Sequence, residues 1–405
     1  MLIAGDPSGD LVAAELVRAL RETLAGDPRP ATLDSPPPPS TLAPRFFGAG
    51  GPRMQAAGVD LAFDMTRHSL IGLSDVFRKY LEFRRLFARL RLLAIERQPD
   101  AIVCVDFSGF NRRFAGAIRR YVRPRRDAFH PWNPRIIQYV SPQVWASRAG
   151  RVRQIARDFD LVLSTIPFEK AWYADRAPGL PVEFVGNPVV ERYGAGCRVP
   201  AAPADVAPAV AGPPCVVLLP GSRAAELRRH IPLVKEAARR MAARAAAQFV
   251  MVLPREELLE PARVLGGEVP NLRYQVGQLE RALAGASLAL TKSGTVTLEC
   301  ALFGVPAVVF YKTSALNYAV GKRVVKVKHI AMPNLLAGEA VFPEFIQQAA
   351  TPENIAEAGI RLLTDDARRG EVRRRLAEVV ATLGGSGASR RAAEAVLRLV
   401  GQVLK

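Results

Sequence analysis

Cysteine and histidine are scarce in this sequence, and neither follows the spacing of a metal site. Four Cys and four His are scattered over 405 residues, with no C-x-x-C pair and no H-E-x-x-H segment. Zinc sites and disulfide frameworks need regular spacings, so neither is expected here. The low cysteine content suits the reducing cytoplasm.

Long apolar runs and aromatic residues are also few. No run approaches the roughly 20 apolar residues that cross a bilayer, and no basic stretch followed by an apolar one indicates a signal peptide. Aromatics make up 7% of the chain and are not interleaved with basic residues as in nucleic-acid-binding folds. The hydrophobic content of 49% indicates a globular protein with a large core.

Acidic residues are outnumbered, because 38 Asp and Glu face 56 Lys and Arg and leave a net charge of +18. Such an excess attracts phosphorylated substrates, an anionic membrane surface or nucleic acid. Residues 112–157 hold twelve Arg and a single acidic residue, Asp127. From 73 to about 96, apolar residues recur at three- and four-residue steps among arginines, which predicts a basic amphipathic helix. Such a helix packs on a core or lies on anionic lipid.

Strand, turn and helix patterns alternate along the chain, which predicts parallel sheets. A stretch rich in Ala and Pro interrupts the alternation. We therefore expect an N-terminal domain over 1–193, a linker over 194–214 and a C-terminal domain over 215–385. The first strand has only three residues before its glycine turn, which is short for a buried parallel sheet and favours a natural start upstream of Met1.

A turn between two apolar segments has the residues of an anion site. Ser293, Gly294 and Thr295 follow a predicted strand and begin a helix, so their N–H groups and the positive helix end can hold an anion. Glu299 lies one helical turn further on, where it can accept hydrogen bonds from sugar hydroxyls. Anion and diol together suggest a nucleotide diphosphate. The alternative is a plain helix cap with a solvated carboxylate.

Other strand ends carry similar side chains. Ser222 and Arg223 begin a helix without the G-K-[ST] of a Walker A loop, and Arg223 offers a planar fork to a diphosphate. Ser8 and Gly9 begin the first helix, although alone they indicate no more than a cap. Asp106 ends the apolar strand 101–105, and a carboxylate there points into the crevice where doubly wound sheets bind ligands.

Eight segments then identify a family resemblance. In order they are AGDPSGD, GAGGPRMQAAG, PDAIVCVDFSGFN, QYVSPQVWASRAGRV, IPFEKAWY, LLPGSRAAEL, SGTVTLECALFGVPAVVFY and MPNLLAGE. From residue 1 to about residue 360 they resemble lipid-A-disaccharide synthases. The resemblance implies an α/β, GT-B-like fold with two doubly wound parallel-sheet domains facing a central cleft. It also implies donor nucleotide on the C-terminal domain and a last helix, at about 386–405, that packs back on the first domain.

The implied reaction joins UDP-2,3-diacylglucosamine to 2,3-diacylglucosamine 1-phosphate and yields a β-1,6 disaccharide 1-phosphate and UDP. No cofactor and no metal are implied. For the base that accepts the proton of the acceptor 6-hydroxyl we expect Asp106, with Asp10 as the substitute. The expected substrate-binding residues are Ser8, Gly9, Ser222, Arg223, Ser293, Gly294, Thr295, Glu299, Asn334, Arg148 and Arg151. Of these, Arg148 and Arg151 are candidates for the acceptor 1-phosphate, and Asn334 borders the donor by resemblance.

Both implied substrates carry fatty acyl chains, so we expect a cytoplasmic protein attached peripherally to the anionic inner membrane. The region 65–95 is the candidate acyl slot. Other readings remain: a UDP-sugar 2-epimerase, a transferase to lipid-linked acceptors, or a basic nucleic-acid-binding protein, which would leave the turns unexplained. The sequence leaves the oligomeric state open.

Four positions depart from the pattern of the family. Asp6 stands where Glu is usual, and Asn187 stands where His is common, so a proton-transfer role is not carried over to Asn187. Gly109 replaces a second Asp of some members, and Ser147 replaces a frequent Trp.

Overall fold

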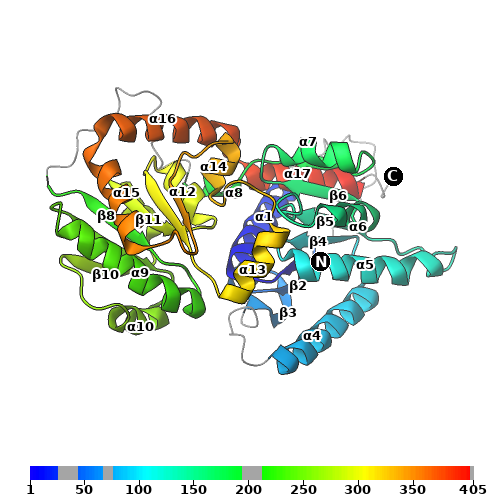
Figure 1. The fold of residues 1–405 in the computed structure, drawn as a ribbon. Helices are drawn as coiled ribbons and strands as arrows, with labels where there is room; N and C mark the ends of the chain where they lie inside the picture. The colour runs from blue at the N-terminus through cyan, green and yellow to red at the C-terminus, as the bar shows by residue number, and fades with distance from the viewer. Residues whose placement is uncertain (26–43, 67–75, 194–211, 402–405) are drawn as a thin grey trace. The chain divides into compact units, whose positions relative to one another are not determined.

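The computed structural model describes residues 1–25, 44–66, 76–193 and 212–401, which form two compact units. The first unit comprises Met1–Glu191 and Gly385–Lys405, and the second comprises Arg192–Gly384. Each is a parallel sheet with helices on its faces (Figure 1). Of the predicted linker, only residues 212–214 are among those described.

The first unit is built on a seven-stranded parallel sheet with the order β3-β2-β1-β4-β5-β6-β7. Its strands are β1 (Leu2–Ala4), β2 (Phe47–Gly50), β3 (Asp60–Asp64), β4 (Ala101–Val105), β5 (Arg135–Tyr139), β6 (Leu161–Ser164) and β7 (Val182–Phe184). The central strands are apolar because both faces are covered. In β4, Ile102 and Cys104 enter one core, whereas Val103 and Val105 enter the core on the opposite face.

Helices cover both faces of this sheet (Figure 1). They are α1 (Pro7–Ala25), α2 (Pro52–Ala56), α4 (Val76–Arg97), α5 (Ser108–Val122), α6 (Val152–Asp158), α7 (Glu169–Arg176), α8 (Pro188–Tyr193) and α17 (Ala388–Gly401). The last helix, α17, packs against α1. Its Ser389 N–H donates to Glu191 Oε2 at 2.8 Å, and Arg391 Nε donates to the carbonyl of Val185 at 2.8 Å. The predicted basic helix corresponds to α4, and its predicted first residues 73–75 lie outside the described ranges.

The second unit has a six-stranded parallel sheet with the order β10-β9-β8-β11-β12-β13. Its strands are β8 (Cys215–Leu219), β9 (Gln248–Leu253), β10 (Leu272–Val276), β11 (Leu288–Lys292), β12 (Ala307–Tyr311) and β13 (Glu344–Ile346). Its helices are α9 (Ala224–Ala242), α10 (Leu259–Val264), α11 (Leu279–Ala284), α12 (Val296–Leu302), α13 (Ala315–Val324), α14 (Met332–Ala337), α15 (Pro352–Thr364) and α16 (Asp366–Thr382).

Both sheets reverse their strand order at a central strand. In the first unit β1 lies between β2 and β4, and in the second β8 lies between β9 and β11. Doubly wound sheets bind ligands beyond the carboxyl ends of the strands at such reversal points. The predicted α/β fold of two doubly wound parallel sheets is thus confirmed, and the two reversal points locate the candidate sites. Within the described ranges, no helix is long and apolar enough to cross a membrane.

Candidate active site

Asp106 lies at the reversal point of the first unit, directly after β4. It has φ 48 and the following Phe107 has φ 39, so two successive non-glycine residues adopt the left-handed region. Each such residue costs about 1–3 kcal/mol and persists only where its surroundings fix it. Here the backbone of Asp106 donates to the carbonyl of Tyr139 at 2.9 Å and accepts from Asn111 Nδ2 at 2.9 Å.

The environment of Asp106 weakens its carboxylic acid. Burial, together with the charge of Asp6, raises its pKa from 3.8 to about 6 against the opposing hydrogen bond of the Phe107 N–H. Asp6 comes close because the preceding Gly5 has no side chain: a Cβ there would lie 2.2 Å from the ring of Phe107. A carboxylate with this pKa is ionised near pH 7 and has the strength that suits a general base.

The residues in the first turn of α1 have structural roles. Asp10 is buried, and its carboxylate accepts hydrogen bonds from the N–H groups of Gly51 at 2.7 Å, Met54 at 3.0 Å and Arg53 at 3.0 Å. It therefore caps α2, which favours a structural role over that of substitute base. Ser8 is exposed in the first turn of α1, and the buried Gly9 donates its N–H to Asp6 Oδ1 at 2.7 Å.

Arg148 and Arg151 follow the carboxyl end of β5, the strand next to β4. Arg148 is exposed, with φ 62, and Arg151 ends the short 3-10 helix η3 (Ala149–Arg151). The loop before them also begins in the left-handed region, at Val140 with φ 61. Such values are unfavourable for a β-branched residue, so the loop must be held by its neighbours.

Glu169 of α7 holds this loop. Its fully buried carboxylate accepts from Trp145 Nε1 at 2.7 Å and contacts Ser164 Oγ at 2.6 Å. Burial raises its pKa from 4.5 to about 7, although the hydrogen bonds from Ser164, Trp145 and Ser141 oppose this. Tyr173, one turn further along α7, donates from its hydroxyl to the carbonyl of Pro142 at 3.2 Å. Side chains of α7 thus hold in place the loop that leads to Arg148 and Arg151.

In the second unit, Ser222 and Arg223 lie in the turn after β8, where Arg223 is the N-cap residue of α9 and is exposed. The N–H of Ser222 donates to Glu226 Oε2 at 3.3 Å, and Arg223 lies 3.7 Å from the same carboxylate. Gly221 has φ 127, and a Cβ there would lie 2.7 Å from Glu226. Only glycine therefore fits this tight turn.

Lys292 is a candidate that the sequence analysis missed. It is the last residue of β11, and its Nζ forms a 3.1 Å ion pair with Glu226 Oε1. Burial disfavours ionisation of Glu226, but the charge and hydrogen bond of Lys292 hold its pKa below the usual value. This pair joins the start of α9, the helix that follows β8, to the end of β11, and β8 and β11 are neighbours at the reversal point. The sequence carries one signal for this role, because Lys292 is a cation directly before the predicted anion-binding turn that begins at Ser293.

Ser293, Gly294 and Thr295 form the turn between β11 and α12. Ser293 is committed internally, because its N–H donates to Phe310 at 3.0 Å and its hydroxyl to Ile330 at 2.8 Å, both to backbone carbonyls. The N–H groups of Gly294 and Thr295 have no hydrogen-bond partner within the described residues. They are the free donors of this turn.

Glu299 and Asn334 differ in their access to a ligand. Glu299 is half-buried in α12, and its pKa is raised by burial and by Glu280 while Arg192 opposes the rise. Asn334 is fully buried: its Nδ2 donates to Phe342 O and to Glu344 Oε1, both at 2.8 Å, and its Oδ1 accepts from the Phe342 N–H at 2.8 Å. With its amide fully used, Asn334 positions α14 against β13 instead of offering an amide to the donor.

The buried His230 connects two segments at the same end of the sheet of the second unit. It is buried, Nδ1 lies 2.8 Å from the carbonyl of Pro220, and Nε2 lies 3.2 Å from the N–H of Lys312. Burial lowers its pKa, so the neutral ring donates from Nδ1 and accepts at Nε2. His230 thereby ties the turn after β8 to the end of β12. Across the described ranges, no group of three or more His, Cys, Asp or Glu could hold a metal ion.

The structure describes the surroundings of Asn187 and Gly109, two of the positions that depart from the family pattern. The Asn187 side chain is buried, donates to the Thr165 carbonyl at 3.2 Å and accepts the N–H of Val189 at 3.1 Å, which caps α8. A Cβ at Gly109 would meet no atom within 4 Å, so this position in α5 faces open space.

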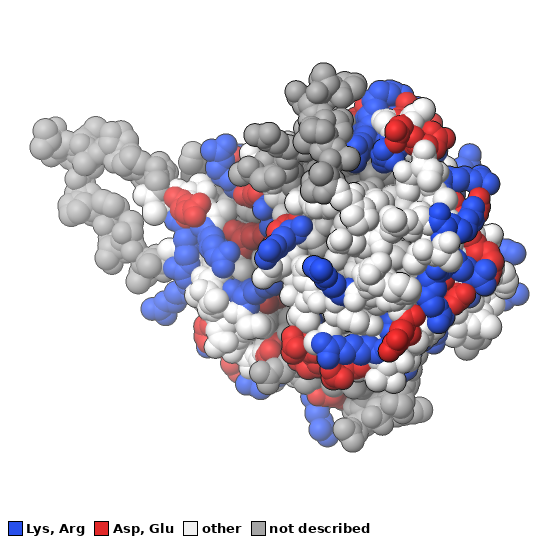
Figure 2. Space-filling model, turned by 90° about the vertical axis from the view of Figure 1, so that its left-hand side faces the viewer, with Lys and Arg blue, Asp and Glu red and all other residues white. Residues whose placement is uncertain are grey.

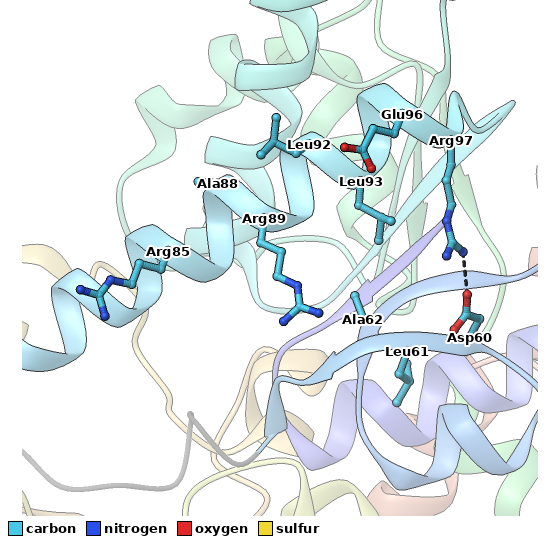
Figure 3. Close-up of a pocket in the computed structure, with 10 residues that line it drawn as sticks. All are labelled: Asp60, Leu61, Ala62, Arg85, Ala88, Arg89, Leu92, Leu93, Glu96 and Arg97. Atoms are coloured by element: carbon cyan, nitrogen blue, oxygen red, sulfur yellow. Dashed lines mark hydrogen bonds and ion pairs between the residues drawn. The ribbon is translucent and has the colours of Figure 1, made fainter.

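A groove of about 670 Å³ lies between α4 and β3 of the first unit (Figure 3). Its residues are Asp60, Leu61, Ala62, Arg85, Ala88, Arg89, Leu92, Leu93, Glu96 and Arg97. An ion pair of 2.6 Å between Arg97 and Asp60 crosses one end, and Arg85 lies further along α4 (Figure 3). Leu92 is 52% exposed, which is high for a leucine. Part of the candidate acyl region 65–95 thus forms one wall of an apolar groove with cationic edges.

The chain is similar to known proteins over nearly its full length. The family model described as "Lipid-A-disaccharide synthetase" matches residues 1–399. The lipid-A-disaccharide synthase of Myxococcus xanthus is 36% identical over 412 residues, covering 99% of this chain and 97% of that protein. The enzyme of the same name from Alkalilimnicola ehrlichii is 37% identical over 409 residues, covering 99% and 98%.

Solved structures show the fold at lower identity. The calicheamicin glycosyltransferase CalG4 is 18% identical, with a TM-score of 0.55 over 100% of this chain and 98% of that one. The UDP-GlcNAc 2-epimerase from Neisseria meningitidis, bound to UDP-GlcNAc, is 12% identical, with a TM-score of 0.58 over 95% and 96%. These neighbours are glycosyltransferases and epimerases of the GT-B fold, so this chain has that fold.

Proposed function

Since this chain belongs to the lipid-A-disaccharide synthase family, we propose that it transfers 2,3-diacylglucosamine from UDP to O6 of 2,3-diacylglucosamine 1-phosphate. It is a glycosyltransferase of lipid A synthesis. The observation that carries the proposed chemistry is Asp106, an acid of raised pKa held in a strained conformation at the reversal point of the first sheet.

Asp106 is the general base of the proposed mechanism. Its carboxylate takes the proton of the acceptor 6-hydroxyl while O6 attacks the anomeric carbon of the donor from the face opposite UDP. The bond from that carbon to the UDP oxygen breaks, and UDP leaves with the electron pair. The configuration at the anomeric carbon is inverted, which gives the β-1,6 linkage.

The second unit stabilises the departing UDP. Arg223 and Lys292 supply positive charge, and the N–H groups of Gly294 and Thr295 supply donors, where negative charge develops on the diphosphate. Ser222 adds a hydroxyl in the exposed turn after β8. Glu299 accepts hydrogen bonds from the ribose hydroxyls. Although its pKa is raised, a carboxyl group keeps an acceptor oxygen whether or not it is protonated.

The acceptor is held by the first unit. Arg148 and Arg151 bind its 1-phosphate, and the loop that carries them is fixed by Glu169. The groove between α4 and β3 takes an acyl chain, because Ala62, Leu92 and Leu93 line it and arginines stand at its edges (Figure 3). Burying each CH₂ of such a chain contributes about 0.8 kcal/mol.

Peripheral membrane attachment completes the proposal. Helix α4 carries Arg84, Arg85, Arg89 and Arg91 within its described part, and each basic residue near an anionic surface contributes about 1 kcal/mol. The face of Figure 2, on the side where α10 lies in Figure 1, gives no comparable field, since acidic and basic side chains alternate there around an uncharged area.

The deciding experiment incubates the purified protein with both acylated sugars and analyses the products by mass spectrometry. Appearance of the tetraacylated disaccharide 1-phosphate with stoichiometric UDP is expected. A parallel reaction with non-acylated UDP-GlcNAc separates this activity from 2-epimerisation. Conversion of that sugar to its 2-epimer, with no disaccharide from the acylated pair, would refute the proposal.

A further inference from the structure

Four arginines of the first unit form a cluster on α5 and on the segment that leads into α6. Arg112 and Arg113 lie early in α5, and Arg148 and Arg151 lie in the segment that leads into α6. The two helices pack together, and Arg112 Nη1 donates to Gln154 Oε1 of α6 at 2.6 Å although 42 residues separate them. We call these four residues the arginine cluster.

The arginine cluster has no acidic partner. Within the described ranges, none of its guanidinium groups forms a salt bridge with a carboxylate, and the nearby Asp158 is engaged by Arg157 through bonds of 2.8 and 2.9 Å. Arg112 is only 7% exposed, and its Nε has no hydrogen-bond partner among the described residues. A buried guanidinium with an unused donor requires an acceptor to offset its desolvation.

Electrostatics agree with this geometry. Burial lowers the pKa of Arg112, and the charges of the other three arginines lower it further, with only Asp158 opposing. Burial also lowers the pKa of Arg151, to which Arg148 and Arg113 add. Like charges gathered in this way repel one another until an anion binds between them.

A phosphate monoester supplies the negative charge and the acceptor oxygens that the arginine cluster lacks. It carries nearly two negative charges near pH 7 and three acceptor oxygens, and guanidinium groups bind such oxygens in pairs. We infer that the arginine cluster is a phosphomonoester site and that its ligand is the 1-phosphate of the acceptor sugar. This inference rests on the proposed function, and it adds Arg112 and Arg113 to the acceptor site.

The position of the cluster favours the acceptor over the donor. Asp106 and Phe107 lead directly into α5, and the four steps from Ser108 to Arg112 rise by about 6 Å along the helix. The inference therefore places O6 of the acceptor at Asp106 and its 1-phosphate at the arginines, both on the first unit. The turns proposed for UDP belong to the second unit, whereas Asp106 and the cluster share the first.

The test uses the double variant Arg113→Gln/Arg151→Gln in the full-length protein. Arg113 is exposed and Arg151 is half-buried, so the fold should persist, and unchanged UDP affinity checks it. The matched control is Arg120→Gln/Arg153→Gln, which removes one exposed arginine from α5 and one from α6. Three readouts are compared: KM for the acceptor with and without its 1-phosphate, ³¹P NMR titration with glucosamine 1-phosphate, and retention on phosphatidylglycerol vesicles.

We expect the double variant to raise KM for the phosphorylated acceptor about tenfold or more and to leave KM for the phosphate-free acceptor unchanged. It should also lose binding of glucosamine 1-phosphate, while the control keeps both. An equal loss with both acceptors would overturn the inference. So would a loss of vesicle retention alone, which would assign the cluster to lipid headgroups. If the wild type forms no disaccharide, the proposed function fails, and the NMR titration still decides the phosphate site separately.

Discussion

Replacing Glu169 by Gln should stabilise the protein, and only at neutral and alkaline pH. The carboxyl group is fully buried, and its pKa is about 7 in the folded chain against an ordinary value of 4.5, chiefly because of burial. A raised folded-state pKa contributes stability that is fully present below pH 4.5 and is lost as the pH rises to about 7. Folding thus becomes less favourable across this range, because the folded chain must release a proton that it holds more tightly.

The magnitude follows from the two pKa values. Each tenfold change in proton affinity corresponds to about 1.4 kcal/mol, so Glu169 costs about 3 kcal/mol at pH 8 compared with pH 4. A glutamine avoids this cost, because it is neutral at every pH. It also fits the hydrogen bonds: Oε1 still accepts from Trp145, and Nε2 donates to Ser164 Oγ, whose hydrogen turns to the carbonyl of Ile166 at 2.8 Å.

The assay is equilibrium urea unfolding of the wild type and Glu169→Gln at pH 5 and pH 8. The variant should gain up to about 3 kcal/mol at pH 8 and little at pH 5. Glu183→Gln is the control, since Glu183 lies half-exposed in β7 with only a surface ion pair to Arg398 and should change little at either pH. Equal shifts for Glu169→Gln at both pH values would refute the reasoning, because the effect would then not come from ionisation.

Three further outcomes are expected. Asp106→Asn should keep UDP affinity while turnover falls about a hundredfold or more, and near-normal turnover would place the base elsewhere. Arg223→Ala should weaken UDP binding by roughly 1.5–3 kcal/mol through loss of a charged donor, which calorimetry measures; unchanged affinity would remove Arg223 from the donor site. The protein should sediment with phosphatidylglycerol vesicles at low salt, dissociate at high salt, and bind less when Arg84, Arg85 and Arg89 become Glu. Equal binding to neutral and anionic vesicles, or binding to neither, would assign the positive excess to substrate phosphates alone.

Local pattern in the sequence determined the elements and the turns. Alternation of apolar runs with helical periodicity is a property of neighbouring residues, so it predicted the two parallel sheets. The same is true of Asp106, which could be placed at a strand end because an apolar run ends there. The Ser293 turn was predicted for the same reason, as a strand and a helix flank it.

The availability of each side chain depended on tertiary contacts. Asp10 and Asn334 have the residue types of a site, yet Asp10 is used by backbone N–H groups about 40 residues away, and Asn334 is used by Phe342 and Glu344. Lys292 went unnoticed because its role depends on Glu226, which lies in the first turn of α9, 66 residues away in the sequence. Residue type and spacing do not reveal such partners, since hydrogen bonds between distant segments exist only after the sheet has formed.

The sequence by itself thus determined the family, the sheet architecture and the strand ends at which chemistry is possible. Only the tertiary structure decided the electrostatics. It brought Asp6 close to Asp106 across 100 residues and raised the pKa of the proposed base. It also gathered Arg112 of α5 with Arg148 of the segment that leads into α6. The physical reason is that burial and Coulomb interactions depend on distances in space, which chain separation does not fix.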